Sequence, residues 1–217
     1  MPLTLLIADD HPMFRGAMLH ALGTLLTDGR ALEAGSHSAM EAVLARGEHV
    51  DLVLLDLTMP GAMGFSSLLW LRGEHPEIPV LVVSSNDHPR NVRRAQQFGA
   101  AGFVSKSAPS EVLREAVETV MAGGTAFIGA RAERSEEDAK LAARLASLTP
   151  QQFRVLMLVA EGLLNKQIAS ELGLAENTVK IHVTAVLSKL DCRSRTQAAV
   201  LVKSLDLDEG VEGSHPG

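Results

Sequence analysis

Short apolar runs alternate with segments of helical periodicity through residues 1–122. The apolar runs have the length and composition of strands buried on both faces of a sheet. They span residues 3–8, 50–56, 79–85 and 101–105, with a weaker candidate at 31–36. The helical segments place apolar residues at i, i+3 and i+4 spacing and end near a Gly or a Pro. They span residues 12–26, 38–47, 64–76, 90–99 and 109–124. Five strands that alternate with five helices predict an α/β domain with a doubly wound, five-stranded parallel sheet.

The pattern changes after residue 122, which predicts a second and smaller domain. Residues 123–146 are charged and rich in Ala, and we interpret them as a partly helical linker. Residues 147–205 show helical periodicity alone, which indicates an all-α domain. Its first helix is expected at Thr149 as N-cap, with Pro150 at the first helical position and Gln152 closing a capping box. Residues 206–217 are acidic and contain several Gly, and we expect a disordered tail.

Composition and charge narrow the class of protein. Hydrophobic residues make up 46% of the 217 positions, which is enough to form a buried core. Residues 1–122 hold 9 basic and 14 acidic side chains, whereas residues 148–204 hold 7 and 4, so only the second domain is expected to meet a polyanion. No apolar run approaches the roughly 20 residues of a membrane span, and no secretory signal is recognisable. With a single Cys192, these features predict a cytoplasmic protein without membrane attachment.

Charged and hydroxyl-bearing residues follow the predicted strands at the point where each strand ends. They are Asp9 and Asp10 after the first strand, Asp56 after the third, Ser84 after the fourth and Lys106 after the fifth. A parallel sheet delivers such residues to one edge. Two adjacent carboxylates repel each other, and Mg²⁺, which binds one or two carboxylates and keeps several waters, would relieve that repulsion. A further carboxylate can act as a nucleophile, so this edge is a candidate site for phosphoryl transfer.

Each of these residues also has an ordinary structural interpretation. Asp10 could simply be the N-cap of the helix that begins near Pro12. Asp56 could cap a loop, and Lys106 could be a solvated surface charge. The placement of all of them at successive strand ends favours a site.

The motifs around these positions resemble the receiver domain of two-component systems over residues 3–122. They are ADD after the first strand, LLDLTMPGAMG around Asp56, SS after the fourth strand and K after GAAGFVS. The resemblance implies that Asp56 accepts a phosphoryl group from a sensor histidine kinase. It also implies the following Mg²⁺ ligands: the carboxylates of Asp10 and Asp56, Asp9 through water, and the backbone carbonyl of Thr58. Ser84 and Lys106 would contact the phosphoryl group, and Phe103 occupies the position of the family's aromatic switch residue.

A second motif lies in the helical domain, in the stretch NKQIASELGLAENTVKIHVTAVLSKL at residues 165–190. The small Ala169 lets a second helix approach, and Gly173 allows the positive φ of a tight turn. Val179 would pack the two helices together with Ile168 and Leu172. This spacing is typical of a helix-turn-helix, whose second helix enters the major groove of DNA. A plain helical hairpin is the alternative.

Residues 147–203 resemble the LuxR-type DNA-binding domain, and the two domains together resemble a response regulator of the NarL/FixJ family. The resemblance implies contacts with double-stranded DNA by Lys166, Thr178, Lys180, Ile181 and Thr184, with Lys189 or Arg195 as further phosphate contacts. Phosphate contacts position the protein, whereas contacts with base edges read the sequence. The family implies a transcription regulator that forms a homodimer when phosphorylated, and no enzyme activity beyond its own phosphotransfer and autodephosphorylation.

Two other functions remain open. An aspartyl-nucleophile phosphatase commonly has a second Asp two residues after the nucleophile, where this chain has Thr58. A DNA-binding regulator that is independent of phosphorylation would use the first domain for dimerisation alone, although every phosphotransfer residue is present.

Overall fold

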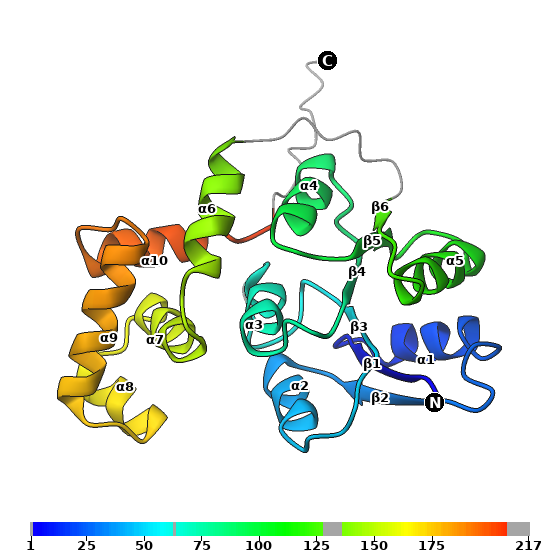
Figure 1. Ribbon diagram of the computed structural model, residues 1–217, viewed down its shortest axis with the longest axis horizontal. Helices are drawn as coiled ribbons and strands as arrows, with labels where there is room; N and C mark the ends of the chain where they lie inside the picture. The colour runs from blue at the N-terminus through cyan, green and yellow to red at the C-terminus, as the bar shows by residue number, and fades with distance from the viewer. Residues whose placement is uncertain (1, 63, 128–135, 208–217) are drawn as a thin grey trace, which may run out of the picture.

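The computed structural model describes residues 2–62, 64–127 and 136–207 of the chain (Figure 1). Its first part contains a parallel sheet in the strand order β2-β1-β3-β4-β5-β6. The strands are β1 (Thr4–Ala8), β2 (Arg30–Ala34), β3 (Leu52–Leu55), β4 (Val80–Ser84), β5 (Gly102–Ser105) and β6 (Ala126–Phe127). The predicted α/β class is confirmed. The predicted number of five strands is wrong, because the described residues form a six-stranded sheet.

The additional strand lies in the stretch that was predicted to be a linker. Ala126 pairs with Gly102, and Phe127 pairs with Phe103. Gly102 permits this pairing, because a Cβ at that position would lie 2.6 Å from the carbonyl oxygen of Ala126. Two residues are too few to show a hydrophobic period, so the strand leaves no pattern in the sequence.

Helices cover both faces of the sheet, as the long apolar runs require. One face carries α1 (Pro12–Ala21) and α5 (Ser110–Met121), and the other carries α2 (His37–Leu44), α3 (Ser66–Glu74) and α4 (Pro89–Gln97) (Figure 1). Side chains of β1 alternate between the two layers. Leu5 and Ile7 pack on the side of α1 and α5, whereas Leu6 packs on the opposite side.

The second part of the chain is helical. Its elements are α6 (Glu136–Ala146), α7 (Pro150–Ala160), α8 (Asn165–Leu172), α9 (Glu176–Lys189) and α10 (Arg195–Lys203). The predicted capping box is present at the start of α7: Thr149 Oγ1 accepts from Gln152 N at 3.3 Å, and Gln152 Oε1 accepts from Thr149 N at 3.0 Å. Within the described ranges, no helix has both the length and the apolar character needed to cross a membrane. Most of the predicted tail, residues 208–217, lies outside the described residues.

The two parts meet through α6 and α7, which lie against α3 and α4 (Figure 1). An ion pair of 3.2 Å joins Arg154 of α7 to Glu74 of α3. Helix α9 lies on the far side of α7 from the sheet, so in this arrangement the sheet domain does not cover it (Figure 1).

Candidate functional site

Three carboxylates meet at the carboxyl edge of the sheet. Asp9 directly follows β1 and Asp56 directly follows β3, and the two side chains are almost fully buried, at 0% and 1% exposure. Ligand atoms of Asp9, Asp10, His11 and Asp56 lie within 4.8 Å of one another. The parallel strands therefore bring together the acidic residues that the sequence placed at one edge.

Lys106 supplies the positive charge of this cluster. Its Nζ lies 2.7 Å from Asp9 Oδ2 and 2.9 Å from Asp56 Oδ2. Burial lowers the pKa of Lys106, but its hydrogen bonds with the two carboxylates outweigh that effect and leave the pKa above its ordinary value. Lys106 is thus a buried cation at neutral pH and not the solvated surface charge that was considered from the sequence. The ring of Phe14 lies 4.8 Å from its Nζ and covers the ammonium group.

Thr58 contacts the candidate acceptor directly. Its Oγ1 donates a hydrogen bond of 2.8 Å to Asp56 Oδ2, which also accepts from Lys106. The other oxygen, Asp56 Oδ1, is buried and has no hydrogen-bond partner among the described residues. A buried anionic oxygen without a partner is costly.

The residues at this edge fit a hard divalent cation. Such a cation prefers oxygen ligands, and Mg²⁺ is bound by few carboxylates. The free Asp56 Oδ1 and the neighbouring carboxylates of Asp9 and Asp10 offer oxygen ligands of this kind. A cation at this position would satisfy the unpartnered oxygen and offset the repulsion between the acids.

Asp10 is not the N-cap of α1, so the simpler interpretation of this residue is wrong. The N-cap is His11, which makes no side-chain capping bond. Instead, His11 N donates to Asp9 Oδ1 at 2.8 Å, which is a turn closed by an Asp side chain, and His11 Nδ1 lies 2.6 Å from Asp10 Oδ1. The sequence interpretation missed both His11 and Phe14. Their position within five residues of Asp10 was the available signal.

Ser84 and Phe103 lie on the neighbouring strands. Ser84 ends β4 with 0% exposure, and its Oγ accepts a hydrogen bond of 3.2 Å from Asn86 N. Phe103 of β5 is 3% exposed and belongs to the core between the sheet and α2, α3 and α4. Its ring is therefore directed inward in this structure.

The helix-turn-helix geometry is present in α8 and α9. Gly173 has φ of +64° and ends α8, as a tight turn requires. Ile168 and Val179 are both 0% exposed and belong to one apolar cluster, with Leu172 partly buried against it. The alternative of a plain helical hairpin agrees less well with the structure, because both the turn at Gly173 and the packing of the two helices follow the helix-turn-helix pattern.

The predicted DNA-contacting residues lie mainly on open surface. Lys166, Lys180, Ile181 and Thr184 are exposed, and Thr178 is half-buried. Lys180 Nζ forms an exposed ion pair of 3.3 Å with Glu176, one turn earlier in α9. The exposed Ile181, at 69%, is an apolar side chain that no described element covers.

Two further residues that were predicted to contact DNA phosphates form hydrogen bonds within their own domain in this structure. Lys189 Nζ donates to Ser147 O at 2.7 Å and to Gln152 Oε1 at 2.8 Å. The guanidinium of Arg195 donates to Asn165 and to the carbonyl of Leu163, so it ties α10 to the start of α8. Both side chains hold the helices together in this structure.

Known protein families match both parts of the chain. Residues 5–118 match the response regulator receiver domain. Residues 146–202 match the bacterial regulatory proteins of the luxR family.

Several known proteins are similar to this chain over almost its whole length. The glycerol metabolism activator of Pseudomonas putida is 36% identical over 215 residues, which cover 93% of this chain and 96% of the relative. The nitrate/nitrite response regulator protein NarL of Escherichia coli K12 is 34% identical over 212 residues, covering 93% and 95%. A solved structure of RcsB from Salmonella enterica serovar Typhimurium, bound to a promoter in the presence of a phosphomimetic, has a TM-score of 0.54 and 20% identity over 94% of this chain and 99% of that one. The chain belongs to the NarL/FixJ family of two-component response regulators, in which a receiver domain precedes a LuxR-type DNA-binding domain.

Proposed function

We propose that this response regulator is controlled by phosphorylation of Asp56 and that α9 reads DNA. The observation that carries the proposal is the state of the Asp56 carboxylate. One oxygen is held by Lys106 and Thr58, and the other is buried without a partner in the described structure. A carboxylate that is held in place beside a buried cation is suited to accept a phosphoryl group.

The chemistry requires a donor with a reactive phosphoryl group, and a phosphohistidine of a sensor kinase has that character. A carboxylate oxygen of Asp56 forms a bond to phosphorus while the bond between phosphorus and the donor nitrogen breaks. Lys106 would neutralise charge on the phosphoryl oxygens, and the Ser84 hydroxyl would donate a hydrogen bond to one of them. Mg²⁺ held by Asp9, Asp10, Asp56 and the Thr58 carbonyl would supply further positive charge at this position.

The DNA-binding step would use the open face of α9. Lys180, Ile181 and Thr184 are exposed on it, and the charge of residues 148–204 is positive. Helix-turn-helix proteins bind as dimers whose half-sites lie about one helical turn, roughly 34–36 Å, apart. We expect the phosphorylated protein to be such a homodimer, acting on transcription in the cytoplasm.

The test of the acceptor is replacement of Asp56 by Asn. Full-length wild type incubated with acetyl phosphate and Mg²⁺ should incorporate phosphate, as measured by phosphate-affinity electrophoresis and intact mass. Asp56→Asn should incorporate none, because an amide cannot form the acyl phosphate. Asp28→Asn is the matched control, because Asp28 is exposed and precedes β2 at the opposite end of the sheet. Incorporation that survives in Asp56→Asn would refute the assignment.

The exposure of α9 favours one alternative, a regulator that binds DNA without phosphorylation. Equal DNA affinity of wild type with and without acetyl phosphate, in a sample that is demonstrably phosphorylated, would favour that alternative. The phosphatase alternative finds no support, because the side chain two residues after Asp56 is the hydroxyl of Thr58, which binds Asp56 itself.

A further inference from the structure

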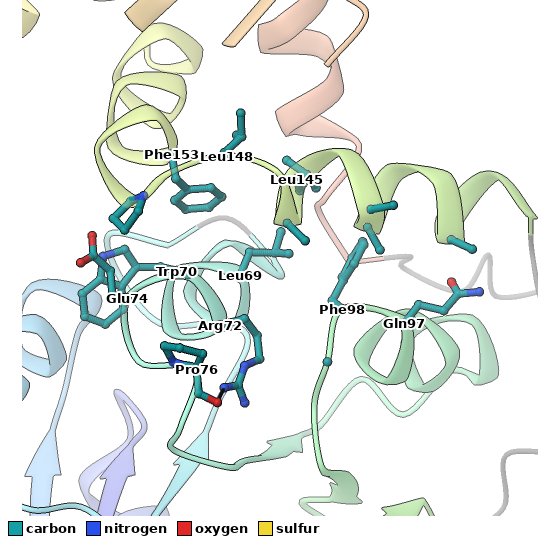
Figure 2. A pocket seen from close by; sticks show the side chains of 17 residues that line it. Leu69, Trp70, Arg72, Glu74, Pro76, Gln97, Phe98, Leu145, Leu148 and Phe153 are labelled. Atoms are coloured by element: carbon teal, nitrogen blue, oxygen red, sulfur yellow. Dashed lines mark hydrogen bonds between the residues drawn. The ribbon is translucent and has the colours of Figure 1, made fainter. Parts of the chain in front are cut away.

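A cavity of about 610 Å³ lies between the two domains. Its walls come from α3 and α4 on one side and from α6 and α7 on the other. Figure 2 shows apolar side chains of both walls, among them Leu69, Phe98, Leu145 and Phe153. Protein interiors are close-packed and contain few voids larger than a water molecule, whereas sites for small molecules are clefts of about 300–1,000 Å³ with mainly apolar and aromatic linings. The cavity has the size and the lining of such a site.

Small residues on both walls leave this space open. Gly73 of α3 lines the cavity, and a Cβ at its position would meet no atom within 4 Å. The opposite wall includes four alanines of α6, which are Ala139, Ala142, Ala143 and Ala146. A methyl group is too short to reach across the gap, and side chains that face a void lose dispersion contacts on that side. An apolar occupant would restore those contacts.

Direct contacts hold the two domains at this separation. Phe65 N donates to Leu205 O at 3.1 Å, and Leu205 is fully buried. Gly64 leaves room for this contact, because a Cβ there would lie 2.2 Å from Leu205 O. The guanidinium of Arg94 donates to Ser204 O at 2.5 Å. These hydrogen bonds are directional and oppose a movement of the domains that would close the cavity.

A buried donor in the lining lacks a hydrogen-bond partner within the described part of the chain. Trp70 is 4% exposed, and its Nε1 is buried without an acceptor. A buried N–H group in this state is destabilising, and such groups are nearly always satisfied in folded proteins. The indole N–H can only donate. The partner that it lacks is therefore an acceptor, such as a carbonyl, ether or hydroxyl oxygen.

The charged side chains that line the cavity already have partners. Arg72 donates to Ile78 O at 3.0 Å and to Pro76 O. Glu74 forms an ion pair of 3.2 Å with Arg154. An ionised molecule would lose its hydration in an apolar space whose charges are already paired, which is costly. The lining therefore favours an uncharged occupant.

We propose that this cavity binds a small, uncharged aromatic or alicyclic molecule with one oxygen acceptor, and that the acceptor binds Trp70 Nε1. The ring of the molecule packs between the apolar side chains of the receiver and those of α6 and α7. The hydrogen bond to Trp70 fixes its orientation. The site uses no residue of the phosphoryl site, so it lies beyond the proposed function. Because both domains supply its walls, the occupant favours the arrangement in which they are in contact.

The single Trp of the chain gives a direct readout, because isotopically labelled full-length protein has one indole N–H signal in a nitrogen–proton correlation spectrum. The probe is acetophenone, which has an aromatic ring and a carbonyl acceptor. Its matched control is ethylbenzene, which has nearly the same shape without the oxygen. Titration with acetophenone should move the indole N–H signal saturably and to lower field, because the N–H gains an acceptor. Ethylbenzene should cause no such downfield movement.

The role of the indole N–H is tested with Trp70→Phe, which keeps an aromatic side chain and removes the donor. Ligand-detected NMR measures the affinities of acetophenone and ethylbenzene for each protein. The ratio of the two affinities should shift against acetophenone by roughly five-fold in Trp70→Phe, which corresponds to one net hydrogen bond. An unchanged ratio would overturn the assignment of the acceptor to Trp70.

The place of binding is tested with two substitutions of Gly73. Gly73→Leu puts a side chain into the open space of the cavity and should weaken acetophenone binding about ten-fold or more. Gly73→Ala adds one methyl group and should bind nearly as wild type does. Both variants are expected to fold, since a Cβ meets no atom there and either residue favours a helix more than Gly does. Absence of a saturable shift in wild type, or unchanged affinity in Gly73→Leu, would overturn the proposal.

Discussion

The start of the recognition helix lacks a side-chain cap, and supplying one should stabilise the protein. Ala175 is the N-cap of α9, with φ −72° and ψ 143°, and makes no capping bond. The N-cap Thr149 of α7 has nearly the same backbone, φ −73° and ψ 159°, and accepts from Gln152 N at 3.3 Å. A Ser at position 175 should in the same way accept from the backbone N–H of Thr178, three residues on. The backbone needs no rearrangement, so the full effect of the added bond is expected.

The magnitude follows from the exposure of the site. N-cap replacements change stability by about 0.5–2 kcal/mol, and about 1 kcal/mol is typical. Because Ala175 is exposed, the new bond replaces one with water, which favours the middle of that range. A gain of about 1 kcal/mol raises the ratio of folded to unfolded protein about five-fold. If the chain unfolds in one transition, Ala175→Ser should raise Tm by about 2–4 °C.

The assay is urea unfolding and thermal unfolding of full-length protein, followed by circular dichroism. The matched control removes an existing cap: Ser194 Oγ accepts from Gln197 N at 3.2 Å at the start of α10. Ser194→Ala should lower the free energy of unfolding by a similar amount, about 1 kcal/mol. If Ser194→Ala is destabilising and Ala175→Ser leaves stability unchanged, the reasoning about the start of α9 is refuted.

Three other substitutions test separate parts of the structure. Lys180→Ala should weaken binding to a selected cognate duplex by about 1–3 kcal/mol and should weaken binding to a scrambled duplex by less. Fluorescence anisotropy measures both affinities, and an equal loss on the two duplexes would contradict base reading by Lys180. Burial lowers the pKa of His37 below 6.5, and this effect is larger than the opposing effect of Glu41. The unfolded state therefore takes up a proton at a higher pH than the folded state does. The contribution of His37 to the stability of the fold is complete above pH 6.5 and is lost as the pH falls. The fall in Tm from about pH 7 to about pH 5 should therefore be smaller in His37→Gln, and an identical fall would contradict this role. Leu205→Ala should cost about 2–5 kcal/mol in urea unfolding because Leu205 is fully buried, whereas Val200→Ala, at 61% exposure, should cost little, and equal effects would argue against the docking of residue 205.

The fold of the receiver could be predicted because its signals are local. Apolar runs such as Leu5–Ile7 identify central strands without knowledge of their neighbours, and parallel order then brings Asp9, Asp56 and Lys106 to one edge. The strand β6 could not be predicted in this way. Its two residues become a strand only because Gly102 lets them approach β5.

The details of the site depend on side-chain rotamers, which the sequence pattern does not specify. The Thr58 hydroxyl binds Asp56, and His11 rather than Asp10 stands at the start of α1. The contacts that Lys189 and Arg195 make within their own domain could not be predicted for a similar reason. A basic side chain near a DNA-binding helix has the same sequence signature whether it binds phosphate or a neighbouring carbonyl. Contacts between domains, such as Arg94 with Ser204, join positions 110 residues apart and leave no periodic signal at all.

The fit of residues 204–206 against Gly64 and Phe65 limits how the two domains can be exchanged between related regulators. The DNA-binding unit of this chain brings with it a short docking strip that follows its last helix. A chimera that joined this unit to a receiver with a larger side chain in place of Gly64 would meet a steric clash rather than a neutral surface. A functional chimera would have to take residues 204–206 and the positions of Gly64 and Phe65 from the same parent, although these positions lie far apart in the sequence.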